Sequence, residues 1–65
     1  MKKIIRRVTN VFQTSTYKTD KHYITFRDKD YEFVVNAKKG VVECKDEALQ
    51  QRVTLLLGNL LSKRN

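Results

Sequence analysis

The alternation of apolar and polar residues in the middle of the chain predicts a β-meander. Two segments, Tyr23 to Arg27 and Tyr31 to Asn36, are rich in β-branched and aromatic residues, and the turn-forming sequence Arg27-Asp28-Lys29-Asp30 lies between them. The segment Ala37-Lys38-Lys39-Gly40 is predicted to form a second turn, because Gly40 can adopt a positive φ without steric cost. A third strand follows this turn. We therefore expect three short antiparallel strands joined by two tight turns.

The strand register follows from the pairing that keeps the two faces of the sheet distinct. We predict Phe26 opposite Tyr31, which makes His22 the first residue of its strand, and Val35 opposite Val42. A one-residue shift would mix apolar and polar side chains on both faces. Both turns then select one apolar face, made of Ile24, Phe26, Tyr31, Phe33, Val35, Val42 and Cys44.

Two amphipathic segments outside the meander are predicted to cover this face. Apolar residues recur at helical spacing over residues 3–12, and Lys3, Arg6, Arg7 and Asn10 lie on the opposite side of that helix. The C-terminal segment begins at Asp46, a residue suited to capping a helix. Its apolar stripe consists of Leu49, Val53, Leu56, Leu57, Leu60 and Leu61 and leaves Leu55 outside.

The predicted fold is a single small basic α+β domain over residues 1–65, with element order α-β-β-β-α. A three-stranded antiparallel sheet is covered by a long C-terminal helix and a short N-terminal helix. Residues 13–21 form either a loop or a loop around a short strand near Thr14 to Tyr17. If residues 3–12 were extended, the alternative would be a four-stranded sheet with one helix.

The net charge is unevenly distributed along the chain. The formal charge is +7, with +5 in residues 1–19, −1 in residues 20–47 and +3 in residues 48–65. If the two ends of the chain lie side by side, they make one positive surface for a polyanion. The candidate phosphate-contacting residues are Lys2, Lys3, Arg6, Arg7, Lys38, Lys39, Lys63 and Arg64.

Several classes of function find no support in the sequence. A single cysteine cannot form an internal disulfide or a cysteine-rich zinc site, and a lone histidine makes a weak metal site. The chain contains no phosphate-binding glycine loop, nucleophile elbow or metalloprotease motif. We predict no catalytic residues, metal or cofactor, and no membrane association, because no apolar run could span a bilayer. A cytoplasmic location follows from these expectations.

Three functions fit the sequence, in this order. The first is a small basic nucleic-acid-binding or accessory protein. The second is a compact inhibitor or regulator of the kind that phages and mobile elements encode, which docks on an acidic or nucleic-acid-handling protein through Tyr23, Val34, Val41 and Leu55. A homodimer through an exposed edge strand is a further option. The third is a metal-free ribonuclease toxin using His22 as a general base.

Two distant resemblances accompany these hypotheses. The element order, together with the spacing of Tyr17, His22 and Phe26, resembles that of the double-stranded RNA-binding domain. Two features depart from that family: no Gly-Pro precedes His22, and Asp46-Glu47 stands where the family has a pair of lysines at the start of its last helix. Residues 22–35 are also similar to HicA-type ribonuclease toxins, in which a strand-borne histidine is catalytic. Asp20-Lys21 replaces the glycine and serine that precede the histidine there. Neither resemblance identifies a family.

Overall fold

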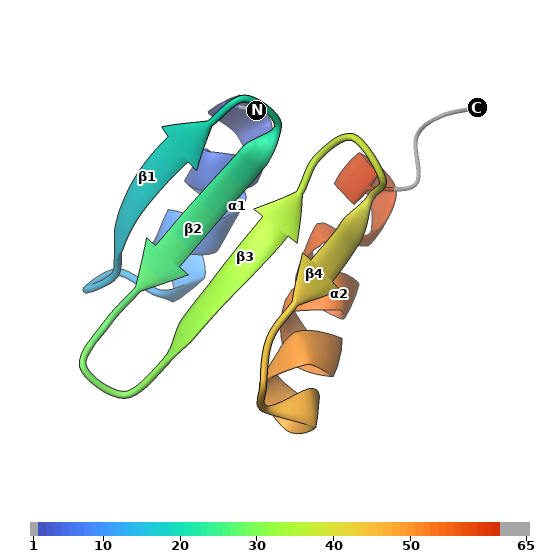
Figure 1. Ribbon diagram of the computed structural model, residues 1–65. Coiled ribbons are helices and arrows are strands. Elements are labelled where there is room, and N and C mark those ends of the chain that lie inside the picture. The colour runs from blue at the N-terminus through green and yellow to red at the C-terminus, as the bar shows by residue number, and fades with distance from the viewer. Residues whose placement is uncertain (1, 62–65) are drawn as a thin grey trace.

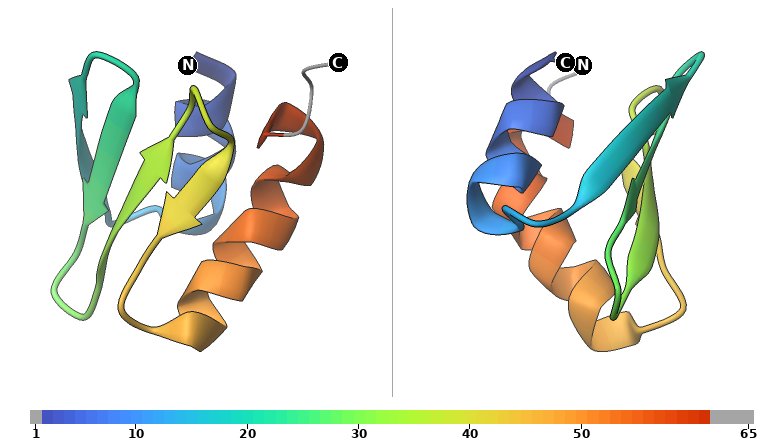
Figure 2. Two further views of the ribbon diagram at one scale, coloured as in Figure 1. Left: turned by 45° about the vertical axis from the view of Figure 1, so that its right-hand side comes forward. Right: turned by 90° about the vertical axis from the view of Figure 1, so that its left-hand side faces the viewer.

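The computed structural model describes residues 2–61 and is an α+β domain with two helices on one face of an antiparallel sheet (Figures 1 and 2). Its elements are α1 (Lys2–Val11), β1 (Thr16–Asp20), β2 (Tyr23–Arg27), β3 (Glu32–Asn36), β4 (Val41–Glu43) and α2 (Glu47–Leu61). The strands follow one another in the sheet in chain order. The fold class, the meander and the N-terminal helix are therefore as predicted.

The sheet contains four strands, the number in the alternative prediction, but the additional strand is β1 rather than residues 3–12. It lies within residues 13–21, where a short strand near Thr14 to Tyr17 was one of the two predicted options. Strand β1 pairs with β2 from Thr16 opposite Arg27 to Asp20 opposite Tyr23. All five of its residues are exposed, and Tyr17 retains 51% of its surface although it lies on the helix side of the sheet, opposite Phe26. No side chain of β1 belongs to the buried core. The strand is therefore held at the edge of the sheet mainly by its backbone hydrogen bonds to β2.

The register of β3 and β4 is confirmed, whereas that of β2 and β3 differs from the prediction by two residues. Val35 lies opposite Val42, but Phe26 lies opposite Phe33 and not opposite Tyr31. The rings of Phe26 and Phe33 stack with centroids 5.2 Å apart, and Tyr31 stays in the loop, where its carbonyl accepts a hydrogen bond from Asp28 N at 2.9 Å. A shift of two residues keeps every side chain on its predicted face.

The core lies between the sheet and the two helices. Its fully buried residues are Ile4, Val8, Ile24, Phe26, Phe33, Val35, Val42, Val53 and Leu57. Tyr31 and Cys44 are partly buried against this cluster, so the predicted apolar face is confirmed. Val11 belongs to the apolar residues at helical spacing in residues 3–12, but it is 55% exposed at the end of α1.

The start of α2 is capped as predicted. The Asp46 carboxylate accepts hydrogen bonds from the backbone N–H groups of Ala48 at 2.9 Å and Leu49 at 3.3 Å. The Gln50 side chain then donates to the Val42 carbonyl at 2.8 Å, which joins the first turn of α2 to β4. Neither helix of the described part of the chain is long and apolar enough to cross a membrane.

Candidate nucleic-acid interface

The meander brings two lysine-bearing turns to the same end of the molecule. The β1–β2 turn (residues 21–22) and the β3–β4 turn (residues 37–40) both lie at the end where α1 begins and α2 finishes (Figures 1 and 2). The Ala37 N–H donates a hydrogen bond of 2.8 Å to the His22 carbonyl, so the two turns are directly joined. We call this part of the molecule the basic end and define it by Lys2, Lys3, Lys21, Lys38 and Lys39.

A buried asparagine shapes the β3–β4 turn. Asn36 is only 2% exposed, and its side-chain oxygen accepts hydrogen bonds from the backbone N–H groups of Lys38 at 3.1 Å and Lys39 at 3.0 Å. The Gly40 N–H donates to the Asn36 carbonyl at 2.8 Å and closes the turn. Both lysine side chains are exposed, so the turn holds two cations at a fixed place in solvent.

Gly40 is required for this turn on two separate grounds. Its φ is +72°, which glycine adopts without the steric penalty that other residues incur. In addition, a Cβ at this position would lie 2.5 Å from the carbonyl oxygen of Leu61. The lysine turn is therefore packed against the end of α2, and the predicted positive φ of Gly40 is confirmed.

The β1–β2 turn contains Lys21 in an uncommon backbone conformation. Two-residue hairpin turns need a positive φ, and here Lys21 supplies it at +57° where Gly, Asn or Asp is usual. His22 is the second turn residue and is half-buried, which corrects its predicted place at the start of β2 and opposite Val35. Strand β1 makes residues 21–22 the connection of a hairpin, and the two-residue difference in the β2–β3 register places Ile24 opposite Val35 in place of His22.

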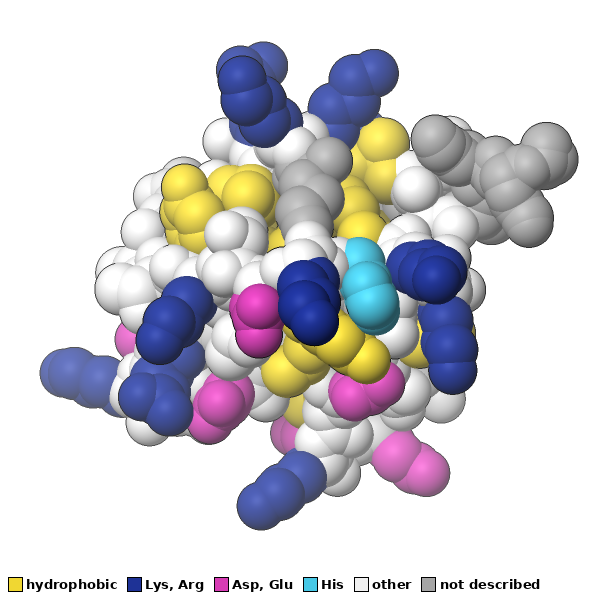
Figure 3. Space-filling model, turned by 45° about the horizontal axis from the view of Figure 1, so that its top comes forward, with side chains coloured by type: hydrophobic (Ala, Val, Ile, Leu, Met, Phe, Trp, Pro, Cys, Tyr) yellow, Lys and Arg dark blue, Asp and Glu magenta, His cyan; other side chains and the backbone are white. Residues whose placement is uncertain are grey.

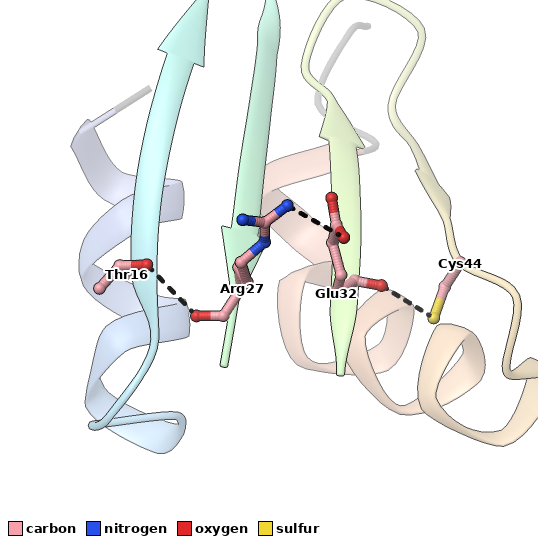
Figure 4. A network of polar contacts seen from close by, with 4 residues as sticks. All are labelled: Thr16, Arg27, Glu32 and Cys44. Carbon is pink, nitrogen blue, oxygen red and sulfur yellow. Dashed lines mark hydrogen bonds and ion pairs between the residues drawn. The ribbon is translucent and has the colours of Figure 1, made fainter. Parts of the chain in front are cut away.

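Acidic residues gather at the opposite end of the molecule. Six of the seven acids lie at or near the β2–β3 loop and the β4–α2 connection: Asp28, Asp30, Glu32, Glu43, Asp46 and Glu47. Among residues 2–61 the single ion pair, Arg27 with Glu32 at 3.6 Å, is also there, and Figure 4 shows it beside the contacts of Thr16 and Cys44. Asp20 is the one acid near the basic end, so the charge is separated along the molecule.

The structure brings together half of the predicted phosphate-contacting residues. Lys2, Lys3, Lys38 and Lys39 belong to the basic end, and Figure 3 shows Lys and Arg side chains on several sides of His22 there. Arg6 and Arg7 are exposed further along α1, and the Arg7 guanidinium donates to the Leu56 carbonyl of α2 at 3.4 Å.

Two predicted phosphate contacts lie outside the described residues, and one lysine of the basic end was not predicted. Lys63 and Arg64 lie outside the described residues. Lys21 was missed because its role depends on β1, a strand without buried side chains. Residues 16–20 and 23–27 have equal length and are separated only by Lys21 and His22, a spacing that is compatible with a two-residue hairpin turn. This spacing is the signal from which Lys21 could have been placed in a turn.

The predicted protein-interface residues occupy two different faces. Tyr23, Val34 and Val41 lie on the outer face of the sheet, away from the helices, and Tyr23 and Val41 are exposed. Leu55 is on α2, is 81% exposed and lines a shallow hollow with Gln50, Gln51 and Thr54. These four residues do not form one surface.

The other candidate chemistry in residues 2–61 concerns metal ions and His22. In the described part of the chain, no group of three or more His, Cys, Asp or Glu side chains is placed to hold a metal ion. The His22 imidazole contacts the Tyr23 ring, with centroids 4.4 Å apart and planes inclined by 36°. Comparison with protein-family models, with curated proteins and with solved structures finds no match.

Proposed function

We propose that the protein binds the phosphate backbone of nucleic acid through its basic end. The observation that carries this proposal is the separation of charge: five lysines from three separate segments lie at one end, and six of the seven acids lie at the other. A cluster of cations without paired acids attracts a polyanion, and the acidic end repels it. The polyanion is therefore expected to bind at one end and not along the whole molecule.

The placement of three of these lysines supports a role beyond folding. Lys2 and Lys3 occupy the first turn of α1, which contains no acid, although the positive end of the helix dipole disfavours cations by about 0.3 kcal/mol or more each. Lys21 adopts a left-handed conformation that costs a side-chain-bearing residue about 1 kcal/mol. Residues that are locally unfavourable are often kept for function.

Salt dependence of binding to oligonucleotides tests this proposal. Five phosphate contacts predict that log K falls against log salt with a slope of about −3.5 for a single strand, or about a hundredfold between 50 and 200 mM salt. Fluorescence anisotropy of labelled DNA and RNA strands gives both numbers. Failure to bind any strand at 50 mM salt would refute the proposal.

A matched pair of double variants separates the basic end from net charge. Lys38→Gln with Lys39→Gln should weaken binding and reduce the slope by about 1.4, because two contacts are lost. Lys29→Gln with Lys45→Gln removes the same charge from the acidic end and should leave the slope unchanged. Asp20→Asn should tighten binding several-fold. Equal effects of the two double variants would contradict binding at one end.

A protein partner is the second candidate function, and the exposure of Leu55 supports it. Exposed apolar surface with a polar rim can mark an interface, and Leu55 borders a hollow on α2 whose other lining residues are polar. A partner on this face predicts that Leu55→Gln abolishes capture of that partner without reducing thermal stability. Leu55→Gln should have no effect on oligonucleotide binding, because α2 presents this residue away from the two turns.

A further inference from the structure

We infer that the basic end takes single-stranded nucleic acid and stacks one unpaired base on Tyr23. This inference rests on the proposed function and specifies its substrate. Tyr23 begins β2 directly after the β1–β2 turn, and the residue is 39% exposed. It therefore offers an aromatic surface next to the two lysine-bearing turns.

The position of Tyr23 between the two turns is fixed by backbone pairing. Tyr23 lies opposite Asn36, the residue that shapes the lysine turn, and Asn36 in turn lies opposite Val41. The adjacent His22 carbonyl accepts the Ala37 N–H at 2.8 Å. Lys21 thus precedes the ring in the chain, while Lys38 and Lys39 follow on the neighbouring hairpin. A strand that contacts both turns passes the Tyr23 ring.

The His22 ring lies beside this surface. Its centroid is 4.4 Å from that of Tyr23, so a half-buried second aromatic ring adjoins the exposed tyrosine. Figure 3 shows the histidine between Lys and Arg side chains on this side of the molecule. Aromatic rings beside a positively charged groove are the features with which proteins hold single strands, since every base has a face that can stack.

A duplex does not present such a base. Bases inside a double helix are stacked on one another, and proteins reach their faces only in single strands, loops, ends or flipped nucleotides. Lysines alone would not favour the single strand, because a duplex has the higher density of phosphate charge. The exposed Tyr23 ring is the feature of the basic end that favours the single strand.

The test compares two strands that carry equal phosphate charge. A labelled 12-nucleotide thymidine strand and an abasic strand of the same length differ only in their bases. The protein should bind the thymidine strand about tenfold more tightly, because one stacked base contributes about that factor. Tyr23→Thr keeps a residue suited to strands and should abolish the preference, whereas Tyr23→Phe should retain it.

Tyr17 provides the matched control. It is a tyrosine on the neighbouring strand with 51% exposure, but it lies opposite Phe26 and therefore on the other face of the sheet. Tyr17→Thr should retain the tenfold preference. Since the protein contains no tryptophan, tyrosine emission also reports stacking directly: the thymidine strand should quench it, and Tyr23→Phe should remove the quenching without loss of binding.

The outcomes separate this inference from the proposed function. If neither strand binds at 50 mM salt, the proposed function is wrong. If both strands bind equally well and with strong salt dependence, the proposed function stands and base stacking is refuted. Retention of the preference in Tyr23→Thr, or loss of quenching in Tyr17→Phe and not in Tyr23→Phe, would also refute stacking on Tyr23.

Discussion

Replacement of Asn36 by alanine tests whether this buried side chain holds the lysine turn. The change removes two hydrogen bonds, of 3.1 Å to Lys38 N and 3.0 Å to Lys39 N, each with a net contribution of about 1 kcal/mol. We expect Asn36→Ala to lower the free energy of unfolding by about 2 kcal/mol. In a domain of this size, that corresponds to a fall of roughly 10 °C in the melting temperature.

Thermal and urea unfolding followed by circular dichroism measure this loss. The urea midpoint should fall with an unchanged slope, because the surface exposed on unfolding is nearly the same. Asn10→Ala is the control, since Asn10 is exposed on α1 and its side chain makes no hydrogen bond within the described residues. A fall of less than 3 °C for Asn36→Ala, or equally fast amide exchange at Lys38 and Lys39 in both variants, would refute this account of the turn.

Two further predictions concern other connections of the sheet. Lys21→Gly should raise the free energy of unfolding by about 0.5 kcal/mol, because relief of the left-handed conformation outweighs the greater conformational freedom of glycine in the unfolded chain. The same variant should bind oligonucleotides more weakly, because it loses a cation. A rise or a fall of both stability and affinity would contradict this prediction. The hydrogen bond from the Thr14 hydroxyl, followed by that from the Lys29 amide, lowers the pKa of Asp28 below its ordinary value of 3.8. The ionised Asp28 therefore contributes stability above about pH 4 that is lost as the pH falls through its folded pKa. In Thr14→Val, a carboxyl NMR titration should give a higher Asp28 pKa, and an unchanged pKa would refute the assignment.

Much of the fold could be predicted because the relevant residues are buried. Apolar side chains at a period of two identified β2, β3 and β4, and those at helical spacing identified both helices. The capping aspartate, Asp46, and the left-handed glycine, Gly40, have strong local preferences that the structure retains. The register of β2 and β3 was wrong because Asp28 and Tyr31 close a four-residue loop through their backbones, a contact that hydrophobic pattern does not encode.

Strand β1 could not be predicted from hydrophobic pattern because it buries nothing. Its sequence, Thr-Tyr-Lys-Thr-Asp, is fully exposed, and its stability derives from hydrogen bonds to β2 and from the Tyr17 contact with Phe26, whose ring centroids lie 6.1 Å apart. The same gap hid Lys21 and misplaced His22. Four of the five lysines of the basic end were therefore predicted from the sequence, and the fifth, Lys21, depended on recognising one edge strand.

Strand β1 matters because it makes Lys21 part of a hairpin turn that shares an end of the sheet with the β3–β4 turn. In a meander, successive hairpin turns alternate between ends, so the first and third turns lie together and the second lies apart. Here the first turn contains Lys21, the third contains Lys38 and Lys39, and the second contains Asp28 and Asp30. The two turns at one end of the sheet therefore carry lysines, and the turn at the other end carries aspartates. Without β1 the second and third turns would still lie at opposite ends, but Lys21 would no longer be held in a hairpin turn beside Lys38 and Lys39. The contribution of Lys21 to the basic end, and to the phosphate binding proposed from it, therefore depends on β1.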